Sequence, residues 1–459
     1  MKQESYVPNR FKDAQIEQVP PGILIHNPGN ARKHPKAQIA KLKANISRIG
    51  FTAPILTDAS FNILAGHGRV TAAVELNLPT VPVVRLYGLS EGEKALVGLT
   101  DNALHDMSSF DMSLVIAEVD KVLAAGFDLD LTGFEMGDLD FSMAATGAGP
   151  AQVDPDDLVT IPDPAKRCVS KSGELWRLGD HSLLCGNALE ERSYQLLLGA
   201  DKAQMAITDM PYNVSIRKHA SGLGKVKHPE FAMASGQLSM PEFTTFLTSA
   251  MTLMAQYSVD GSIHFHFMDG AHLDEILTAG RAAYIERKAV CVWDKGSGGM
   301  GSLYRHQEEF VLVFKNGKGR HINNIRLGKY GRYRTTIWRH PGLNSFGKGR
   351  DEQLAAHPTS KPISLISEAL KDCSKRGGLI LDPFGGSGTT IMAAERTGRR
   401  AAVMEIEPRY VDVAIRRWQK ATGKSAYRAS DGVSFAELEV QQFDDVAAEP
   451  SANGEARHD

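Results

Sequence analysis

One segment constrains the fold more than any other. Residues 377–408 read GGLILDPFGGSGTTIMAAERTGRRAAVMEIEP. An apolar strand ends in Asp382, a glycine-rich turn follows, a helix is predicted from Thr389, and a second strand ends at Glu405. A strand, a turn, a helix and a second strand in this order form the repeating unit of an α/β fold with a parallel sheet.

The glycine-rich turn predicts a nucleoside-cofactor site. Gly385, Gly386 and Gly388 let the backbone turn tightly beside a ligand, and the helix N-terminus supplies unpaired amides. The turn has neither the lysine of a Walker loop nor the third glycine of a dinucleotide motif, so these two sites are less favoured. Asp382 and Glu405 would repel a pyrophosphate, whereas they suit a cofactor with a sulfonium cation and ribose hydroxyls.

The same alternation of strands and helices extends over residues 171–425, which predicts a doubly wound, Rossmann-like α/β domain. The expected strands read SLLCG, AQMAITD, SIHFHF, AVCVWD, EFVLVFK, GGLILD and RAAVMEI. The second of these strands runs into TDMPYN, residues 208–213, so that an acid, Asp209, stands where the strand ends.

Composition divides the rest of the chain into modules. We expect a small α/β domain at 1–90, an acidic helical connector at 91–143, a linker at 144–170 and an acidic tail at 426–459. The formal net charge is +6 for residues 1–90, −13 for 91–160, +11 for 161–425 and −6 from 426 onward. Two basic modules around an acidic connector favour a polyanionic partner, although surface charge of arbitrary sign is an alternative explanation.

Several classes of protein are disfavoured by the sequence. No apolar run approaches the ~20 residues needed to cross a bilayer, and the first residues lack a signal peptide, so we expect a cytoplasmic protein without membrane contact. The four cysteines, Cys168, Cys185, Cys291 and Cys373, are widely spaced and form no CxxC pair. Neither a disulfide framework nor a metal site is therefore expected.

Three motifs carry a resemblance to a known family. DPFGGSGTT resembles the cofactor motif of S-adenosylmethionine-dependent DNA amino-methyltransferases, TDMPYN resembles their catalytic tetrapeptide, and HPTSKP stands at 357–362 between them. This order resembles the β-class of the family. The resemblance implies that the Asp209 carboxylate and the Met210 carbonyl accept the two N–H bonds of the target amine, that Pro211 completes the motif, and that Tyr212 stacks on a base flipped out of the duplex.

The resemblance also implies a cofactor, a base and an activity. S-adenosyl-L-methionine would lie against Asp382, Pro383, Phe384, Gly385, Gly386, Ser387, Gly388, Thr389 and Glu405, with Thr359 and Lys361 near its methionine end. Asp and Tyr in the tetrapeptide favour N6 of adenine, and N4 of cytosine is the alternative. Methylation at carbon 5 of cytosine is excluded because no cysteine follows a proline. Whether the enzyme belongs to a restriction-modification pair stays open.

A basic segment is the expected target-recognition region. Residues 315–350 hold ten Lys and Arg and no Asp or Glu, with aromatic residues such as Trp338 between them. Such a segment can neutralise phosphates of double-stranded DNA and contact base edges, and a solvated basic loop is the alternative. The predicted DNA contacts are Arg326, Lys329, Arg332, Arg334 and Arg339.

The N-terminal module has a resemblance of its own. NPGNARKHPKAQIAKLKANISRIGFTAPILTD and ILAGHGRVTAAVELNLPTVPVV resemble the N-terminal domain of ParB-like partition proteins, a fold shared with sulfiredoxin. This implies a nucleotide or protein ligand at Gly66, His67, Gly68 and Arg69, and a docking role. The arginine-rich box is shortened to one arginine, which disfavours nucleotide hydrolysis. A DNA-binding regulatory protein with an inactive methyltransferase half remains an alternative, and so does a homodimer.

Overall fold

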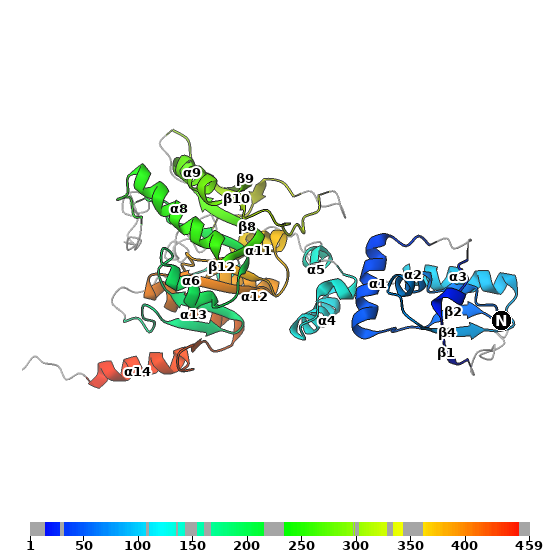
Figure 1. Ribbon diagram of the computed structural model, residues 1–459. Coiled ribbons are helices and arrows are strands. Elements are labelled where there is room, and N and C mark those ends of the chain that lie inside the picture. Colours follow the sequence, from blue (N-terminus) through cyan, green and yellow to red (C-terminus); the bar gives the residue numbers. More distant parts are fainter. Residues whose placement is uncertain are drawn as a thin grey trace, which may run out of the picture. The chain divides into compact units, whose positions relative to one another are not determined.

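The computed structural model describes residues 14–27, 32–106, 110–134, 136–142, 154–159, 167–214, 234–296, 298, 303–327, 334–342 and 361–448. The chain divides into two compact units, residues 1–143 and 144–459 (Figure 1). No helix in these described ranges is long and apolar enough to span a bilayer.

The first unit is built on a four-stranded sheet with the order β1-β4-β2-β3, in which β2 and β4 are parallel and the other pairs antiparallel. Its strands are β1 Ile16–Val19, β2 Ile55–Asp58, β3 Ile63–Ala65 and β4 Val81–Leu86. Its helices are η1 Pro21–Ile23, α1 Lys36–Ile49, α2 His67–Glu75, α3 Glu91–Asp106, α4 Met112–Ala124, η2 Leu129–Thr132 and α5 Met136–Ser142.

The expected acidic connector packs within this unit. The backbone of Gly98, in α3, lies close to the carbonyl of Leu64 in β3. Asn45 and Lys41 of α1 donate to the carbonyls of Leu131 and Gly133, over 3.0 and 3.1 Å. In the described part of residues 91–143, helices α3, α4, η2 and α5 form, and contacts of Gly98, Leu131 and Gly133 connect them to β3 and α1.

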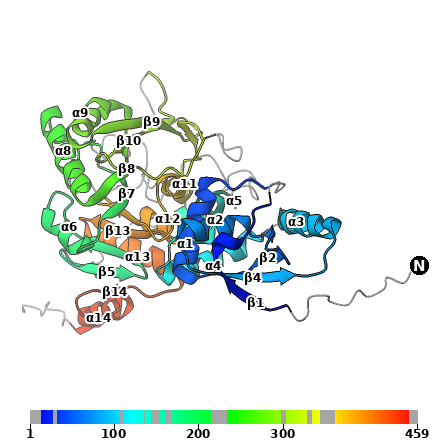
Figure 2. The ribbon, with the colours of Figure 1, turned by 45° about the vertical axis from the view of Figure 1, so that its right-hand side comes forward.

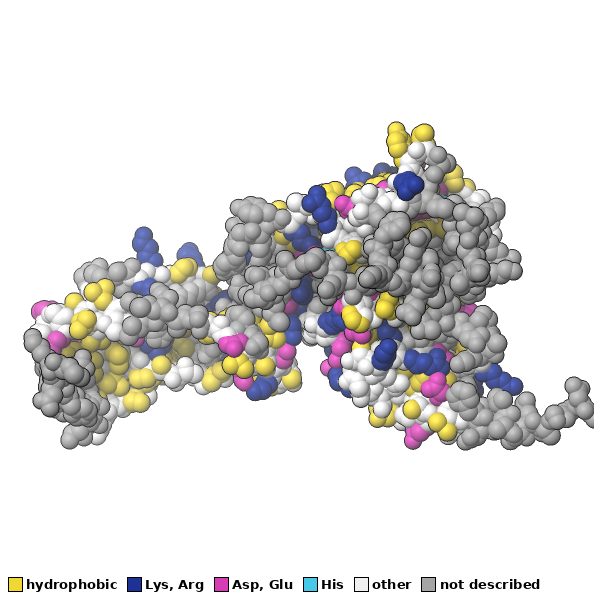
Figure 3. All heavy atoms as spheres, turned by 180° about the vertical axis from the view of Figure 1, so that it is seen from behind, with side chains coloured by type: hydrophobic (Ala, Val, Ile, Leu, Met, Phe, Trp, Pro, Cys, Tyr) yellow, Lys and Arg dark blue, Asp and Glu magenta, His cyan; other side chains and the backbone are white. Residues whose placement is uncertain are grey.

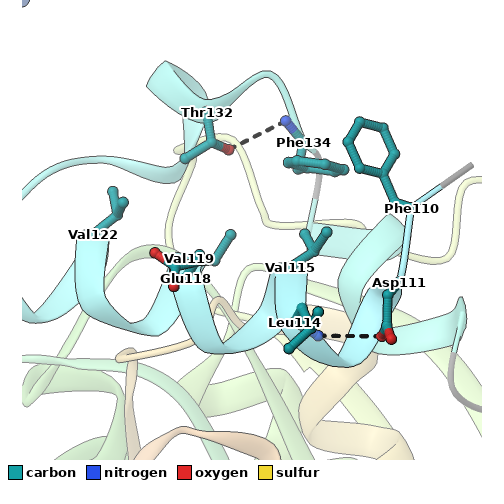
Figure 4. A pocket seen from close by; sticks show the side chains of 9 residues that line it. All are labelled: Phe110, Asp111, Leu114, Val115, Glu118, Val119, Val122, Thr132 and Phe134. Carbon is teal, nitrogen blue, oxygen red and sulfur yellow. Dashed lines mark hydrogen bonds between the residues drawn. The ribbon is translucent and has the colours of Figure 1, made fainter. Parts of the chain in front are cut away.

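An apolar groove of about 400 Å³ runs along α4 (Figure 4). The rings of Phe110 and Phe134 meet edge to face at one end of it, with their centroids 5.2 Å apart. The lining residues are Phe110, Asp111, Leu114, Val115, Glu118, Val119, Val122, Thr132 and Phe134. Phe110 and Leu114 are largely exposed, so α4 presents apolar surface outside the small cluster that it forms with α5.

The second unit contains a ten-stranded sheet with the order β11-β9-β10-β8-β7-β12-β13-β6-β5-β14. Its strands are β5 Leu175–Leu178, β6 His181–Cys185, β7 Ala203–Asp209, β8 Ser258–Met268, β9 Glu286–Asp294, β10 Glu308–Lys315, β11 Ile337–Arg339, β12 Leu379–Asp382, β13 Arg400–Glu405 and β14 Tyr427–Arg428. Its helices are η4 Pro155–Asp157, α6 Glu191–Leu198, α8 Met240–Gln256, η5 Gly270–His272, α9 Leu273–Ala283, α11 Ile363–Cys373, α12 Thr389–Thr397, α13 Pro408–Thr422 and α14 Phe435–Ala448.

Helices cover both faces of this sheet because side chains alternate along each strand. Ala401 and Val403 belong to an apolar cluster with α11, α12 and α13, whereas their neighbours Ala402 and Met404 belong to a cluster with α6. Helices α8 and α9 lie on the opposite side of the sheet from α11 and α12 (Figure 2). The predicted doubly wound α/β fold is confirmed, and all seven expected strands are present.

Two segments differ from expectation. Within the expected linker, Pro155–Asp157 form η4, and Asp157 and Val159 are buried. Within the expected acidic tail, β14 pairs with β5, and Phe435 at the start of α14 is fully buried against Trp176. Composition misled here because a single buried aromatic residue anchors an otherwise acidic helix.

Candidate active site

Three carboxyl groups stand at one edge of the sheet. Strands β7, β12 and β13 are adjacent and parallel, and they end in Asp209, Asp382 and Glu405. The carboxyl ends of parallel strands are where open α/β sheets bind ligands. The topology thus brings together two motifs that are far apart in the sequence.

The glycine-rich turn between β12 and α12 is shaped by close packing. Gly388 caps α12 in the left-handed region with φ of 82°, and a Cβ there would lie 2.7 Å from the Cβ of Ala414. A Cβ on Gly385 would lie 2.1 Å from a methyl carbon of Val403. Gly386 also has a positive φ, 50°, but a Cβ there would meet no atom within 4 Å. The turn is therefore tightly packed at Gly385 and Gly388 and open at Gly386.

Asp382 holds the turn in place through hydrogen bonds to its carboxylate. Its carboxylate accepts hydrogen bonds from the hydroxyls of Thr208 and Thr390, over 2.9 and 2.5 Å, and from the amide of Phe384 over 3.1 Å. The residue is 4% exposed, and burial raises the pKa of its carboxyl to about 6 despite these hydrogen bonds. Asp382 thus fixes β12 to the exit of β7 and to the first turn of α12.

Glu405 lies across from the turn. Its carboxylate accepts hydrogen bonds from the amides of Gly386 and Glu407, over 2.8 and 2.9 Å. Burial, followed by the repulsion of Asp382, raises its pKa to about 7. A carboxylate has about four lone-pair sites, so Glu405 keeps acceptor capacity for hydroxyl groups of a ligand.

The other predicted cofactor residues divide into an accessible and a buried set. Phe384, Gly385 and Gly386 are partly exposed at the tip of the turn, and the ring of Phe384 lies 6.0 Å from that of Phe246. Ser387 and Thr389 are buried, where Arg417 donates to the Ser387 carbonyl and the Thr389 hydroxyl, over 3.2 and 3.1 Å. Pro383 is also buried. These contacts make the buried set a support for the turn.

The turn fits the predicted cofactor on two observations. Open space faces Gly386, where a Cβ would otherwise protrude, and two buried carboxyl groups lie beside that space. Burial raises the pKa of both carboxyl groups, so a sulfonium or ammonium group bound beside them would favour their ionised forms. Thr359 lies outside the described residues.

The corner after β7 holds a network of charged groups around Asp209. Its carboxylate accepts a hydrogen bond from the Tyr212 hydroxyl over 2.6 Å and another from the Lys361 ammonium over 2.7 Å. Lys361 also lies 3.0 Å from a carboxylate oxygen of Glu309, and the Tyr212 hydroxyl lies 3.0 Å from the same oxygen. The second oxygen of Glu309 pairs with Lys295 over 2.7 Å.

Burial and charge balance set the protonation of this network. Lys361 is 6% exposed and packs against the rings of Phe267 and Trp293, yet Asp209 and Glu309 raise its pKa. Burial raises the pKa of Asp209, and Lys361 counters this. Burial also opposes ionisation of Glu309, but Lys361 and Lys295 together lower its pKa to about 2. Glu309 is therefore the firmly ionised carboxylate of the two.

The backbone of the corner is fixed on both sides. Met210 is 1% exposed and packs in the apolar cluster of α8 and α9, while Pro211 follows it and disfavours helical geometry at Met210. Asn213 has a positive φ of 54°, and its side chain exchanges hydrogen bonds with the backbone of Leu238. Met210 thus contributes a buried side chain to this cluster, which the sequence alone does not show.

The sequence predicts Lys361 as a residue of the site but does not predict Glu309. The place of Lys361 near the methionine end of a cofactor stays a prediction; in the structure its ammonium lies on the Asp209 carboxylate. Glu309 was missed. The only signal in the sequence is a second acid in EEF at the start of an otherwise apolar strand, where burial would demand a cationic partner.

The predicted DNA contacts fall into three groups. Arg326 and Arg339 are exposed, and Arg339 lies 3.9 Å from Asp294. Lys329 and Arg332 lie outside the described residues. Arg334 is enclosed instead: its guanidinium pairs with Asp372 over 2.6 Å and with Glu368, so it is not directed to solvent.

Arg334 and Trp338 correct the expected basic surface. The Arg334 guanidinium lies over the ring of Trp338, which is 4% exposed and belongs to the core. Trp338 is therefore part of the core, and Arg334 is held by two carboxylates with about a fifth of its side chain exposed. On the face seen in Figure 3, the described Lys and Arg side chains lie among Asp and Glu side chains.

The GHGR loop of the first unit begins α2. Gly66 caps this helix with φ of 101°, and Arg69 donates from its guanidinium to the Ala53 carbonyl over 2.9 Å. His67 is 9% exposed, and burial, with His26 and His34 nearby, lowers its pKa to about 4. No group of three or more His, Cys, Asp and Glu in the described ranges could hold a metal ion.

Two family models match the chain. One, described as DNA methylase, matches residues 203–416, and the other, described as ParB-methyltransferase HTH domain, matches residues 113–172. The first range contains Asp209, Glu309, Lys361, Asp382 and Glu405. The second range begins in α4 and includes residues of both compact units.

Known proteins resemble parts of the chain. The type II methyltransferase M.ScaI of Streptomyces caespitosus is 37% identical over 103 residues, which make up 22% of this chain and 32% of that protein. The ParB-like nuclease domain-containing protein YnaK of Escherichia coli (strain K12) is 46% identical over 65 residues, 14% of this chain and 75% of that protein. A crystal structure of an M1.HpyAVI–SAM complex covers 51% of this chain and 97% of its own at 19% identity, with a TM-score of 0.38. The chain spans about a third of the length of M.ScaI.

Proposed function

We propose that this chain, which belongs to the N6/N4 DNA methylase family and also carries a ParB-like module, methylates an exocyclic amine of double-stranded DNA. S-adenosyl-L-methionine is the proposed methyl donor, and N6 of adenine is the proposed acceptor. The observation that carries the proposal is the position of Asp209 beside the glycine-rich turn, on adjacent parallel strands.

Asp209 is suited to bind an amine. Its side chain is 30% exposed, so a substrate can reach it, and its carboxylate accepts hydrogen bonds without donating any. The carbonyl of Met210 is the proposed second acceptor. Two acceptors directed at the two N–H bonds draw the nitrogen toward tetrahedral geometry and localise its lone pair, which makes the amine a better nucleophile.

The transfer needs a methyl donor and a proton acceptor. When bound, S-adenosyl-L-methionine supplies an electrophilic methyl group with a neutral thioether as the leaving group. The nitrogen gains the methyl group and must lose one proton to remain neutral. Asp209 is the nearest proposed proton acceptor, and burial, which raises its pKa, favours that role. Glu405, Gly386 and Phe384 are the proposed accessible cofactor contacts.

The choice of adenine over cytosine rests on the tetrapeptide alone. Asp at its first position and Tyr at its fourth are typical of N6-adenine enzymes, and the described contacts of Asp209 suit either amine. N4 of cytosine therefore remains the second candidate. The same measurement distinguishes the two.

The test is methyl transfer from labelled S-adenosyl-L-methionine to unmethylated double-stranded DNA, followed by nucleoside analysis. We expect N6-methyladenine with the native protein and none with Asp209→Asn, which keeps the size of the side chain but is neutral. Asp209→Asn should still bind the cofactor by calorimetry. N4-methylcytosine would refute the choice of base, and cofactor binding without any methylated nucleoside would favour a DNA-binding regulatory protein.

The exposed arginines of the basic segment complete the proposal. Arg326 and Arg339 are the described residues that we propose as DNA contacts, since Arg334 is enclosed. For the ParB-like module we propose a docking role at the loop of Gly66 and Arg69. Binding of DNA by the native protein, compared with residues 144–459 alone, tests whether the module contributes to affinity.

A further inference from the structure

Each oxygen of Asp209 accepts a hydrogen bond from another side chain of the protein. The Tyr212 hydroxyl holds one, and the Lys361 ammonium holds the other, over 2.6 and 2.7 Å. A carboxylate has about four lone-pair sites, so each oxygen can accept further, but a target amine competes with Lys361 and Tyr212 for these two oxygens. Displacing Lys361 would leave a buried ammonium unpaired unless a second carboxylate received it, and an unpaired buried charge is costly.

Glu309 is in place to receive Lys361. Its oxygen lies 3.0 Å from the Lys361 nitrogen, at the start of β10. The side chain of Glu309 is 14% exposed, against 30% for Asp209, so the substrate reaches Asp209 more readily. Lys295 pairs with the other Glu309 oxygen and balances the second negative charge.

We propose that Glu309 is a positioning residue for methyl transfer, which holds the Lys361 ammonium while Asp209 exchanges its hydrogen bond with Lys361 for one with the target amine. This inference rests on the proposed function of Asp209. Glu309 does not touch the substrate and acts through Lys361. Lys361 opposes the rise in the Asp209 pKa that burial causes, and on substrate binding Glu309 becomes the sole carboxylate partner of Lys361 in the described network.

The charges of the network support this exchange. Glu309 and Asp209 face Lys361 from β10 and from the end of β7, Tyr212 contacts it from the same corner, and Lys295 lies behind Glu309. Two carboxylates balance two ammonium groups, so the network is neutral as a whole. The low pKa of Glu309, held down by both lysines, keeps it ionised throughout the exchange.

The test compares Glu309→Gln with Glu308→Gln in the full chain. Glu308 precedes Glu309 on the same strand, and its side chain is 36% exposed and pairs with His306, so it is a matched control. In Glu309→Gln, Lys361 has Asp209 as its remaining carboxylate partner and blocks it. We expect kcat/KM for DNA methylation to fall about 10- to 100-fold at neutral pH, since one charge-assisted hydrogen bond must first be broken. Glu308→Gln should keep native activity.

A pH profile separates positioning from a merely structural role. In Glu309→Gln the rate should rise with pH as Lys361 loses its proton and releases Asp209, whereas the native profile should not rise in parallel. Glu309→Asp, which keeps the charge, should recover most of the activity, and it also serves if Glu309→Gln folds poorly. Cofactor affinity should be unchanged in all three variants.

The assay distinguishes a failure of the Glu309 positioning role from a failure of the proposed function. If the native protein methylates DNA and Glu309→Gln does so equally well with a parallel pH profile, the positioning role is refuted and the proposed function stands. A loss in Glu309→Gln that is equal at every pH, with Glu309→Asp equally inactive, would also refute it. If the native protein methylates no DNA, the proposed function fails first.

Discussion

Alanine substitutions at two glycines of the glycine-rich turn should affect protein stability and ligand binding to different degrees. Gly388 and Gly386 both have positive φ values, 82° and 50°, but only a Cβ on Gly388 meets neighbouring atoms, 2.7 Å from Ala414. Alanine at either position costs about 1 to 2 kcal/mol for the left-handed conformation. At Gly388 the crowding of Ala414 adds about 1 to 3 kcal/mol, because this contact joins the backbone of α12 to that of α13.

We therefore expect Gly388→Ala to destabilise the protein by about 2 to 5 kcal/mol, and Gly386→Ala by about 1 to 2 kcal/mol. The proposed cofactor occupies the open space at Gly386, so Gly386→Ala should weaken S-adenosyl-L-methionine binding at least tenfold although it costs less stability. Urea unfolding gives the free energy of unfolding, and calorimetry on the folded protein gives the dissociation constant.

The two variants should rank in opposite order for stability and for cofactor affinity. Gly386→Ala should be the more stable variant and the weaker binder, and Gly388→Ala should bind better once the measurement is confined to folded protein. Equal stability of the two variants would contradict the packing argument. Native cofactor affinity in Gly386→Ala would remove Gly386 from the cofactor site, whatever its stability.

Three further predictions follow from buried or paired side chains. Since the pKa values of Asp382 and Glu405 are raised to about 6 and about 7, the folded protein holds protons that the unfolded chain has lost; stability should fall as pH rises from about 4.5 to 7. Cofactor affinity should rise over the upper part of that range, and Glu405→Gln should flatten both trends in unfolding and binding titrations. Arg334→Ala should cost about 3 to 5 kcal/mol because it leaves the buried Asp372 carboxyl unpaired, whereas Arg339→Ala should leave stability unchanged and lower the salt slope of DNA binding by about one. Met210→Pro should lower the free energy of unfolding by about 2 kcal/mol or more, because it removes a buried side chain from the α8 and α9 cluster. Urea unfolding measures this change. A gain in stability would show that the restraint of proline on φ outweighs the lost packing.

Local patterns predicted much of the fold because each signal is carried by neighbouring residues. The apolar strand before Asp382 and the glycines after it define a strand, a turn and a helix within one short segment, and β12 and α12 follow that prediction. The strand that ends at Asp209 was predicted in the same way. Both carboxyl groups lie at the same edge because parallel strands end together, which topology requires.

The remaining differences arise where a residue's role depends on a partner distant in sequence. Arg334 resembles the other basic residues of 315–350 until Asp372 and Glu368 of α11 are placed beside it. Residues 154–159 have a linker composition, yet Asp157 accepts a hydrogen bond from the amide of Ile363 at the start of α11 and is buried there. No periodicity or composition can report such pairings, because each depends on a single contact in the folded chain.

The network around Asp209 also depends on contacts between residues that are distant in sequence. The tetrapeptide predicts that Asp209 binds the target amine, but the sequence alone gives no reason to connect it with Glu309, which stands on another strand of the sheet. The connection is made by Lys361, whose ammonium lies 2.7 Å from one carboxylate and 3.0 Å from the other. A buried lysine between two acids must satisfy both, so any ligand that takes Asp209 alters the balance at Glu309. If Asp209 binds the target amine as proposed, that binding depends on the four charged side chains of the network, Asp209, Glu309, Lys361 and Lys295, and not on the tetrapeptide alone.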